Sequence, residues 1–297
     1  MPNPIRREHA KLNATIDGLV NEFALDLADV WGQMRRRMVQ FTAQLTVERG
    51  RVVSTQVNLG LARRVAQELE GVLEEAGYGT LIADALAEMG ELARYQGLGQ
   101  TRVARVQREA AWSAETLDAF HDLKLRELLE VPDVVLRRVE QTLLRGIVGA
   151  QDRAELLNEL LEDLELTLPQ VRTIYDTALS EFSRIAVVST TAGRADDAFL
   201  YEGPIDGLTR PFCLERVGKV FSRAAIDEMD NGQLDNTLIT GGGYNCRHTW
   251  IPVAEGSELA PLADQDAYAG DWYAADVDEA IEARARLKAA KRKARGT

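Results

Sequence analysis

The sequence predicts a mainly α-helical fold, with a long helical N-terminal region followed by a small α+β module with short hairpin strands. Apolar residues recur at steps of three and four through most of residues 5–200, which is the period of an α-helix. That period stops after Ala192-Gly193, where short β-like runs and turn residues take over. We therefore expect three parts: a helical arm and bundle (1–148), a module (149–253), and an acidic linker with a basic C-terminal helix (254–297).

The first long helix is predicted from one continuous apolar stripe. Its members are Ile16, Leu19, Val20, Phe23, Leu27, Val30, Trp31, Met34, Met38, Phe41 and Leu45. Their spacing places them on one helix face. A helix of about 30 residues spans roughly 45 Å, which one small core does not easily cover. We expect this helix to lean on a partner chain or to form an extended arm.

Further helices are predicted by the same period and by glycine and proline residues at their ends. Gly77 and Gly79 end the second helix, and Gly97 and Gly99 end the third. Pro132 and Pro169 suit the first turn of a helix, where the missing N–H has no intrahelical partner. The expected helical ranges are 58–76, 80–95, 114–130, 132–145, 150–164 and 169–194.

The module over 199–253 combines short strands with tight turns. Residues 199–201 read as a strand, and residues 214–222 read as a hairpin with Gly218-Lys219 at its turn. A short helix is expected near 223–229, and Thr249–Val253 as a closing strand. Residues 254–277 read as a linker in which Trp272 and Tyr273 contact a neighbour, and 278–295 as a helix.

The charge is divided unevenly along the chain. The 297 residues carry a formal charge of −12, and residues 284–297 contribute seven basic side chains and no acidic one. The rest of the chain is therefore at −19, which argues against broad coating of nucleic acid. No stretch has the length of apolar sequence that crosses a bilayer, and the start lacks the apolar core of a signal peptide. Two cysteines cannot form a disulfide framework.

The module contains a series of short motifs in a recognisable order. These are Asp206, Thr209-Arg210, Cys213, Gly218-Lys219-Val220-Phe221 and Asn245-Cys246-Arg247, which lead into a strand that contains Trp250. In this order they resemble the phage Mu F-like minor head proteins, also called the phage head morphogenesis family. The resemblance covers residues 150–253. The chain departs from the family pattern at Gly241-Gly242-Gly243-Tyr244, and at His248, which replaces the second Cys of a Cys-Arg-Cys element.

The resemblance implies a non-enzymatic virion protein. It implies association with the portal and other procapsid proteins at the head interior or portal vertex, and a part in head assembly or DNA delivery. The motif residues are then expected to form the turns and core of the module: Asp206, Thr209, Arg210, Cys213, Gly218, Lys219, Phe221, Asn245, Cys246, Arg247 and Trp250. No catalytic residue is assigned. His9 and His121 stand alone and are expected on a helix face or the surface.

The two cysteines are compatible with three arrangements. In the first they bind zinc together with His248 and with Asp206 as a fourth donor, since all four are residue types that bind this metal. In the second, Cys213 and Cys246 form a close or bridged thiol pair. In the third they are unrelated buried thiols that act as small apolar residues. A metal-assisted hydrolase or nuclease built on 199–253 is a rival function.

A DNA-contacting neck adaptor is another rival function. In this role the basic C-terminal tail of the chain binds phosphate groups of double-stranded DNA, or an acidic surface of a partner. The expected contact residues are Lys288, Lys291, Arg292, Lys293 and Arg295.

Overall fold

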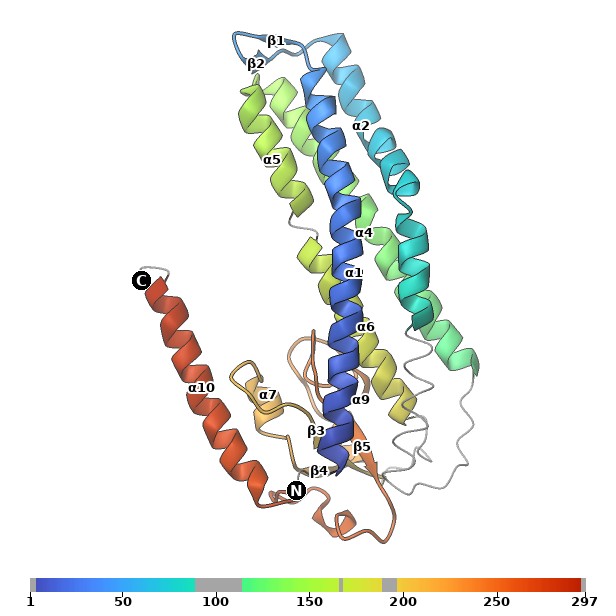
Figure 1. Cartoon of the computed structure of the whole chain (residues 1–297), viewed down its shortest axis with the longest axis vertical. Helices are drawn as coiled ribbons and strands as arrows, with labels where there is room; N and C mark the ends of the chain where they lie inside the picture. The colour runs from blue at the N-terminus through green and yellow to red at the C-terminus, as the bar shows by residue number, and fades with distance from the viewer. Residues whose placement is uncertain (1–3, 89–113, 166–167, 189–196, 295–297) are drawn as a thin grey trace. The chain divides into compact units, whose positions relative to one another are not determined.

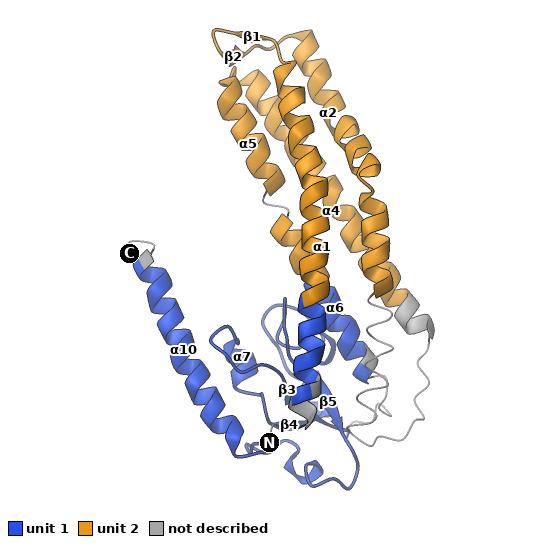
Figure 2. Cartoon of the chain, viewed as in Figure 1, with its two compact units in different colours: residues 1–17, 89–118, 176–297 blue, residues 18–88, 119–175 orange. Residues whose placement is uncertain are grey.

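The computed structural model describes residues 4–88, 114–165, 168–188 and 197–294 (Figure 1). It is 69% helical, with a small sheet of short antiparallel strands in its C-terminal part, which confirms the predicted fold class. The chain divides into two compact units, each drawn from separate stretches of sequence (Figure 2). Unit 1 contains residues 1–17, 89–118 and 176–297, and unit 2 contains residues 18–88 and 119–175.

Unit 2 is built from helices. The elements that enter it are α1 (Pro4–Ala43), the two-residue strands β1 (Val47–Glu48) and β2 (Arg51–Val52), α2 (Gln56–Glu75), a helical stretch over 78–88, α4 (Ala114–Val148), α5 (Arg153–Glu165) and the start of α6 (Leu168–Val188). Thr55 caps α2, because its side chain accepts a hydrogen bond from the N–H of Asn58. Residues 89–95 of the predicted third helix and residues 189–194 of the predicted 169–194 helix lie outside the described residues.

The apolar stripe of α1 is buried by the chain itself. Of the predicted stripe residues only Leu19 is half-buried, and the others are buried. The indole N–H of Trp31 donates to the carbonyl of Leu164 at 2.9 Å, and the ring of Phe23 lies 4.2 Å from that of Tyr175. The expectation that this helix leans on a partner chain or forms an extended arm is therefore wrong for the stripe, because other helices of the bundle supply the covering surface.

Pro132 lies inside a helix and not at the start of one. The predicted helices 114–130 and 132–145 form the single element α4, with Pro132 in its interior. Proline removes one hydrogen bond of a helix and favours a bend, but it does not prevent the helix from continuing where packing holds both sides. Leu128 before it and Val135 after it are both buried, so tertiary packing extends across the proline.

Unit 1 is organised around a three-stranded antiparallel sheet of order β4–β3–β5. Its strands are β3 (Ala198–Glu202), β4 (Val220–Ser222) and β5 (Thr249–Val253). The predicted hairpin over 214–222 is wrong: β4 pairs with β3, and α7 (Pro211–Leu214) and a run of turns lie between them. The predicted strands 199–201 and 249–253 are confirmed, and they pair with each other.

The helices of unit 1 that follow β4 in the sequence pack around this sheet. Its further elements are α8 (Arg223–Asp227), α9 (Thr237–Thr240), the 3₁₀ turn η1 (Ala260–Leu262) and α10 (Trp272–Ala294). The sequence predicts a linker over 254–277, but α10 begins within it, and Tyr273 and Val277 are buried in the core beside Trp250. The linker prediction is wrong because two apolar side chains one helical turn apart suffice to dock a helix whose sequence is otherwise polar.

Candidate metal centre

Three potential metal ligands meet in the core of unit 1. One donor atom from each of Cys213, Cys246 and His248 lies within 4.8 Å of the other two. The two sulfur atoms are 3.9 Å apart and the thiols are free. The three side chains are only 2–3% exposed. The structure thus brings together the three residues that the sequence singled out, from positions far apart in the chain.

Local backbone geometry aims these side chains at one point. Pro211 stands in the first turn of α7, where proline is favoured, and the short helix that follows buries Cys213. Asn245 has a φ of 52°, in the left-handed region that asparagine tolerates, and its N–H donates to the hydroxyl of Thr177 at 3.0 Å. Cys246 and His248 are two residues apart at the entrance to β5, where alternate side chains share a face.

The hydroxyl of Tyr201 is a fourth polar group at the cluster. It lies 3.4 Å from the sulfur of Cys213 and 3.6 Å from that of Cys246. The Tyr201 ring also stacks on the imidazole of His248, with centroids 5.2 Å apart. Tyr201 is not among the residues predicted from the sequence. The alternation of β3 was the available signal, since Phe199 and Tyr201 share the inward face of that strand.

The triple glycine lets the backbone approach the cluster. A Cβ at Gly242 would stand 2.4 Å from the sulfur of Cys213 and 3.3 Å from that of Cys246, so only glycine fits. Its N–H donates to the sulfur of Cys246 at 3.0 Å. A Cβ at Gly241 would press on the guanidinium of Arg184 at 3.0 Å. The glycines therefore make room for the thiols and for an arginine.

Two arginines hold the loop that carries Cys246 and His248. Arg184, buried on α6, donates to the carbonyl of His248 at 2.7 Å, to that of Ile239 at 3.0 Å, and to that of Cys246. Arg210 donates to the carbonyl of Gly242 at 2.9 Å and to that of Tyr244. Arg210 is predicted from the sequence as a structural residue of the module. Arg184 is not, because helical periodicity gives no sign of what an arginine will contact outside its helix.

The surroundings shift the pKa values of the two thiols in opposite directions. The pKa of Cys246 falls well below its ordinary value because Cys213 shares a hydrogen bond with it, and because Arg184 and His248 add to the effect. That shared hydrogen bond and burial raise the pKa of Cys213. Burial also raises the pKa of Tyr201 well above its ordinary value. The shared hydrogen bond between the two sulfurs thus moves the pKa values of the two thiols in opposite directions.

His248 and His9 are both buried, but they differ in whether a ring nitrogen has a hydrogen-bond partner. Nε2 of His248 is buried and has no hydrogen-bond partner among the described residues. His9, near the start of α1, is also buried, and its Nδ1 lies 3.0 Å from the side-chain nitrogen of Asn13. Burial and the charges of His248 and Arg184 lower the pKa of His9 to about 3. His9 is therefore a neutral hydrogen-bond acceptor at neutral pH.

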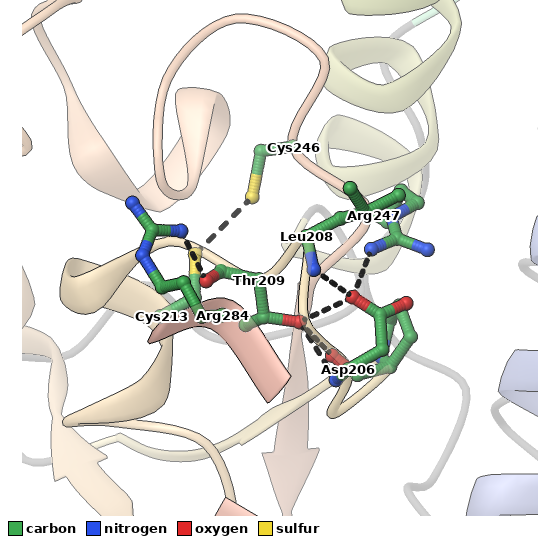
Figure 3. Close-up of polar contacts among 8 residues, drawn as sticks. Asp206, Leu208, Thr209, Cys213, Cys246, Arg247 and Arg284 are labelled. Atoms are coloured by element: carbon green, nitrogen blue, oxygen red, sulfur yellow. Dashed lines mark hydrogen bonds and ion pairs between the residues drawn. The ribbon is translucent and has the colours of Figure 1, made fainter. Parts of the chain in front are cut away.

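Asp206 does not join the cluster but anchors a separate turn (Figure 3). Its carboxylate accepts from the Leu208 N–H at 2.9 Å and from Arg247 at 2.9 Å, while its own N–H donates to the Thr209 hydroxyl at 3.1 Å. Partial burial acts to raise the pKa of Asp206, but Arg247 and the Leu208 N–H outweigh it, so the net change is downward. The suggestion that Asp206 is a zinc ligand is wrong, because these donors already engage its carboxylate.

The same turn receives α10. Arg284 donates to the carbonyl of Thr209 at 2.7 Å (Figure 3). A Cβ at Gly207 would meet Ala283 and Leu287 at 3.3 Å, so the helix lies close against the turn. The docked face of α10 therefore runs from Tyr273 as far as Leu287.

The other predicted module residues have structural positions. Trp250 is fully buried and its indole N–H donates to the carbonyl of Thr237 at 2.9 Å, while the half-buried Phe221 meets it edge-on. Lys219 pairs with Asp266 at 2.5 Å. Gly218 has a φ of 80°, and a Cβ there would collide with the ring of Tyr273.

The predicted basic contact residues are at the end of α10. The side chains of Lys288, Lys291, Arg292 and Lys293 are exposed, and Arg295 lies outside the described residues.

No family model, curated protein or solved structure matches this chain. Within the described residues, none of the helices combines the length and the apolarity needed to span a membrane. The case for a function therefore depends on the arrangement of the motifs. Because the thiols and the imidazole are closed off from solvent, this arrangement suits a structural link between segments of unit 1 better than chemistry on a substrate.

Proposed function

We propose that this chain is a minor head protein of a tailed bacteriophage, similar to the Mu F-like family. In this role it associates with the portal and other procapsid proteins at the head interior or portal vertex, has no enzymatic activity, and contributes to head assembly or DNA delivery. The observation that carries the proposal is the convergence of the family-like motifs. Residues from three separate stretches of sequence meet in one module and contact one another: Asp206 with Arg247, Cys213 with Cys246, and Phe221 with Trp250.

The character of these contacts supports an assembly role. The motif residues satisfy backbone groups, fill the core or fix turns. An acid–base role for Asp206 together with His248 is not supported, because the Asp206 carboxylate pairs with Arg247. A hydrolase or nuclease on this module needs a nucleophile, a base and a substrate in mutual reach. The buried cluster offers a substrate no such access.

Co-expression with a cognate portal protein tests the proposal. We expect the two to co-elute as a stable complex in size-exclusion chromatography. Elution of this chain as a separate monodisperse species, with a correctly assembled portal ring elsewhere in the profile, would refute it.

A matched pair of surface variants tests which of the two units contacts the portal protein. Leu208 is 65% exposed beside Asp206 in unit 1, and Leu25 is 72% exposed on α1 in unit 2. Because the family-like motifs belong to unit 1, we expect Leu208→Ser to weaken co-elution and Leu25→Ser to leave it unchanged. The reverse result would place the portal contact on the helical bundle.

A second candidate function, contact with packaged double-stranded DNA, is favoured by the exposed end of α10. Four basic side chains that follow the docked part of this helix are exposed: Lys288, Lys291, Arg292 and Lys293. Replacing all four by Gln should reduce the slope of log K against log salt for DNA binding by roughly 3–4, because each phosphate contact contributes about 0.9. If the unmodified chain does not bind DNA even at low salt, this function is excluded.

A further inference from the structure

We infer that Cys213, Cys246, His248 and Tyr201 form a structural zinc site that ties the segments of unit 1 together. This inference does not rest on the proposed role in the phage head. The donor types are those that zinc takes in proteins, thiolate and imidazole, with a phenolic oxygen at the fourth position. The segments joined are α7, the loop after the triple glycine, the entrance to β5, and β3.

The spacing of the sulfurs fits a tetrahedral metal. With zinc–sulfur bonds of about 2.3 Å, two thiolates of one tetrahedron are roughly 3.8 Å apart. The observed separation of 3.9 Å between the Cys213 and Cys246 sulfurs is close to that length. It is far longer than the roughly 2.05 Å of a disulfide bond. The pair is thus already spaced for a shared ion without moving the backbone.

The hydroxyl of Tyr201 is placed at another corner of the same tetrahedron. A zinc–oxygen bond of about 2.0 Å puts an oxygen ligand roughly 3.5 Å from each sulfur. The observed distances of 3.4 and 3.6 Å bracket that value. Tyr201 thereby takes the position that Asp206 was expected to fill, and it stands on a rigid central strand of the sheet.

The imidazole of His248 supplies the remaining donor and has an independent reason to bind. One of its ring nitrogens lies within 4.8 Å of both sulfurs, and Nε2 is buried with no hydrogen-bond partner among the described residues. A buried polar atom without a partner destabilises the fold. We therefore assign Nε2 as the coordinating nitrogen, since binding the ion gives it a partner. Gly203 leaves room for the ring, because a Cβ there would stand 2.3 Å from it.

The groups around the donors are arranged as a supporting shell. The N–H of Gly242 donates to the Cys246 sulfur at 3.0 Å, which stabilises a thiolate. Arg184 fixes the carbonyls of both Cys246 and His248, so these two ligands keep their orientation. Such outer contacts orient ligands and sustain metal affinity. Two thiolates also balance the charge of a divalent ion. A tetrahedral set with thiolate and imidazole donors is typical of zinc.

Metal analysis of the full chain tests the inference. The protein is expressed with added zinc, purified under reducing conditions and analysed by mass spectrometry for metals. We expect about one zinc per chain, lost in Cys246→Ser and His248→Ala and retained in the control His121→Ala, whose imidazole is on the surface. Unmodified chain without stoichiometric zinc, or zinc retained by the double variant Cys213→Ser/Cys246→Ser, would overturn the site.

Cobalt substitution keeps the test decisive if a variant fails to fold. Unmodified protein stripped of zinc and loaded with Co²⁺ should show thiolate charge-transfer absorption and the visible bands of tetrahedral cobalt. Tyr201→Phe should shift the visible bands while keeping the charge-transfer absorption. Unshifted bands overturn the assignment of Tyr201 as the fourth ligand. A metal-free protein whose thiols fail to react after denaturation without reductant would instead demonstrate a disulfide and overturn the whole site.

Discussion

Replacing Arg184 by Lys tests the claim that one buried guanidinium holds the Cys246–His248 loop. The arginine is 1% exposed and donates to three backbone carbonyls, those of His248, Ile239 and Cys246. Lysine keeps the positive charge but presents a compact ammonium group that cannot match the planar fork of a guanidinium. The substitution therefore isolates geometry from charge.

The expected loss follows from the hydrogen bonds. A hydrogen bond from a charged donor contributes about 1.5–3 kcal/mol, and lysine should leave one or two of the three carbonyls without a donor. We expect the free energy of opening of unit 1 to fall by about 3 kcal/mol, which corresponds to roughly a 150-fold change in an equilibrium constant. A Cβ at Gly241 would nearly touch the guanidinium, so the smaller head also leaves a gap there.

Hydrogen exchange followed by mass spectrometry measures this loss locally. Peptides that cover β3 and β5 should exchange about a hundredfold faster in Arg184→Lys, while peptides from α2 and α5 in unit 2 should be unchanged. Arg172→Lys is the matched control, since Arg172 is on the same helix but exposed, where it donates to Asn21. Exchange in β3 and β5 within about fivefold of the unmodified protein would refute the reasoning, because it corresponds to under about 1 kcal/mol.

Three further substitutions probe other contacts of unit 1. The pKa of His9 is lowered to about 3 from 6.5, so its neutral form stabilises the fold fully above pH 6.5 and that contribution is lost as the pH falls from 6.5 toward 3. In a plot of the free energy of unfolding against pH, His9→Gln should reduce the loss on the acid side by up to about 5 kcal/mol. His121→Gln is the control, and equal acid losses in the two variants contradict the prediction. Gly242→Ala should destabilise the protein by about 2–4 kcal/mol in urea unfolding, because the added Cβ collides with a buried sulfur. Gly71→Ala on α2 is the control, since its Cβ meets no other atom and alanine favours the helix, so it should stabilise slightly. Equal effects of the two substitutions would disprove the close packing. Asp206→Asn should cost under about 1 kcal/mol at pH 7, because solvent screens this partly exposed carboxylate, and less still at pH 3. The lowered pKa of Asp206 makes its carboxylate stabilising above its unfolded-state pKa, and that benefit disappears as the pH falls. A loss independent of pH would show that the charge is irrelevant.

Local pattern predicted the elements, and long-range packing decided their partners. The period of the α1 stripe placed its buried residues correctly, since burial on a helix follows spacing. The same period could not show that the bundle itself covers the stripe. Pro132 reads as a helix start because a proline lacks a donor in any context, yet packing on both sides carries α4 through it. Likewise β4 was identified, but its pairing with β3 in place of a local hairpin depends on the tertiary fold.

At the candidate site, too, the sequence predicted some residues and the tertiary fold decided others. Cys213, Cys246 and His248 were identifiable because few residue types bind metals, and the chain has two cysteines and three histidines. Tyr201 and Arg184 were not identifiable, because a tyrosine on a strand and an arginine on a helix have many ordinary roles. What distinguishes them is proximity to the thiols and to the loop carbonyls, which only the fold creates.

Unit 1 takes its parts from both ends of the chain, and this affects the order in which the protein can fold during synthesis. His9 leaves the ribosome long before Arg184 and His248, which are part of its buried surroundings. The helices of unit 2 lie between them in the sequence and can pack as they emerge. The N-terminal segment that carries His9 lacks these neighbours until α6 and the entrance to β5 have been made. A chain that stops before β5 thus leaves this segment uncovered, and such exposed segments are open to quality-control proteases.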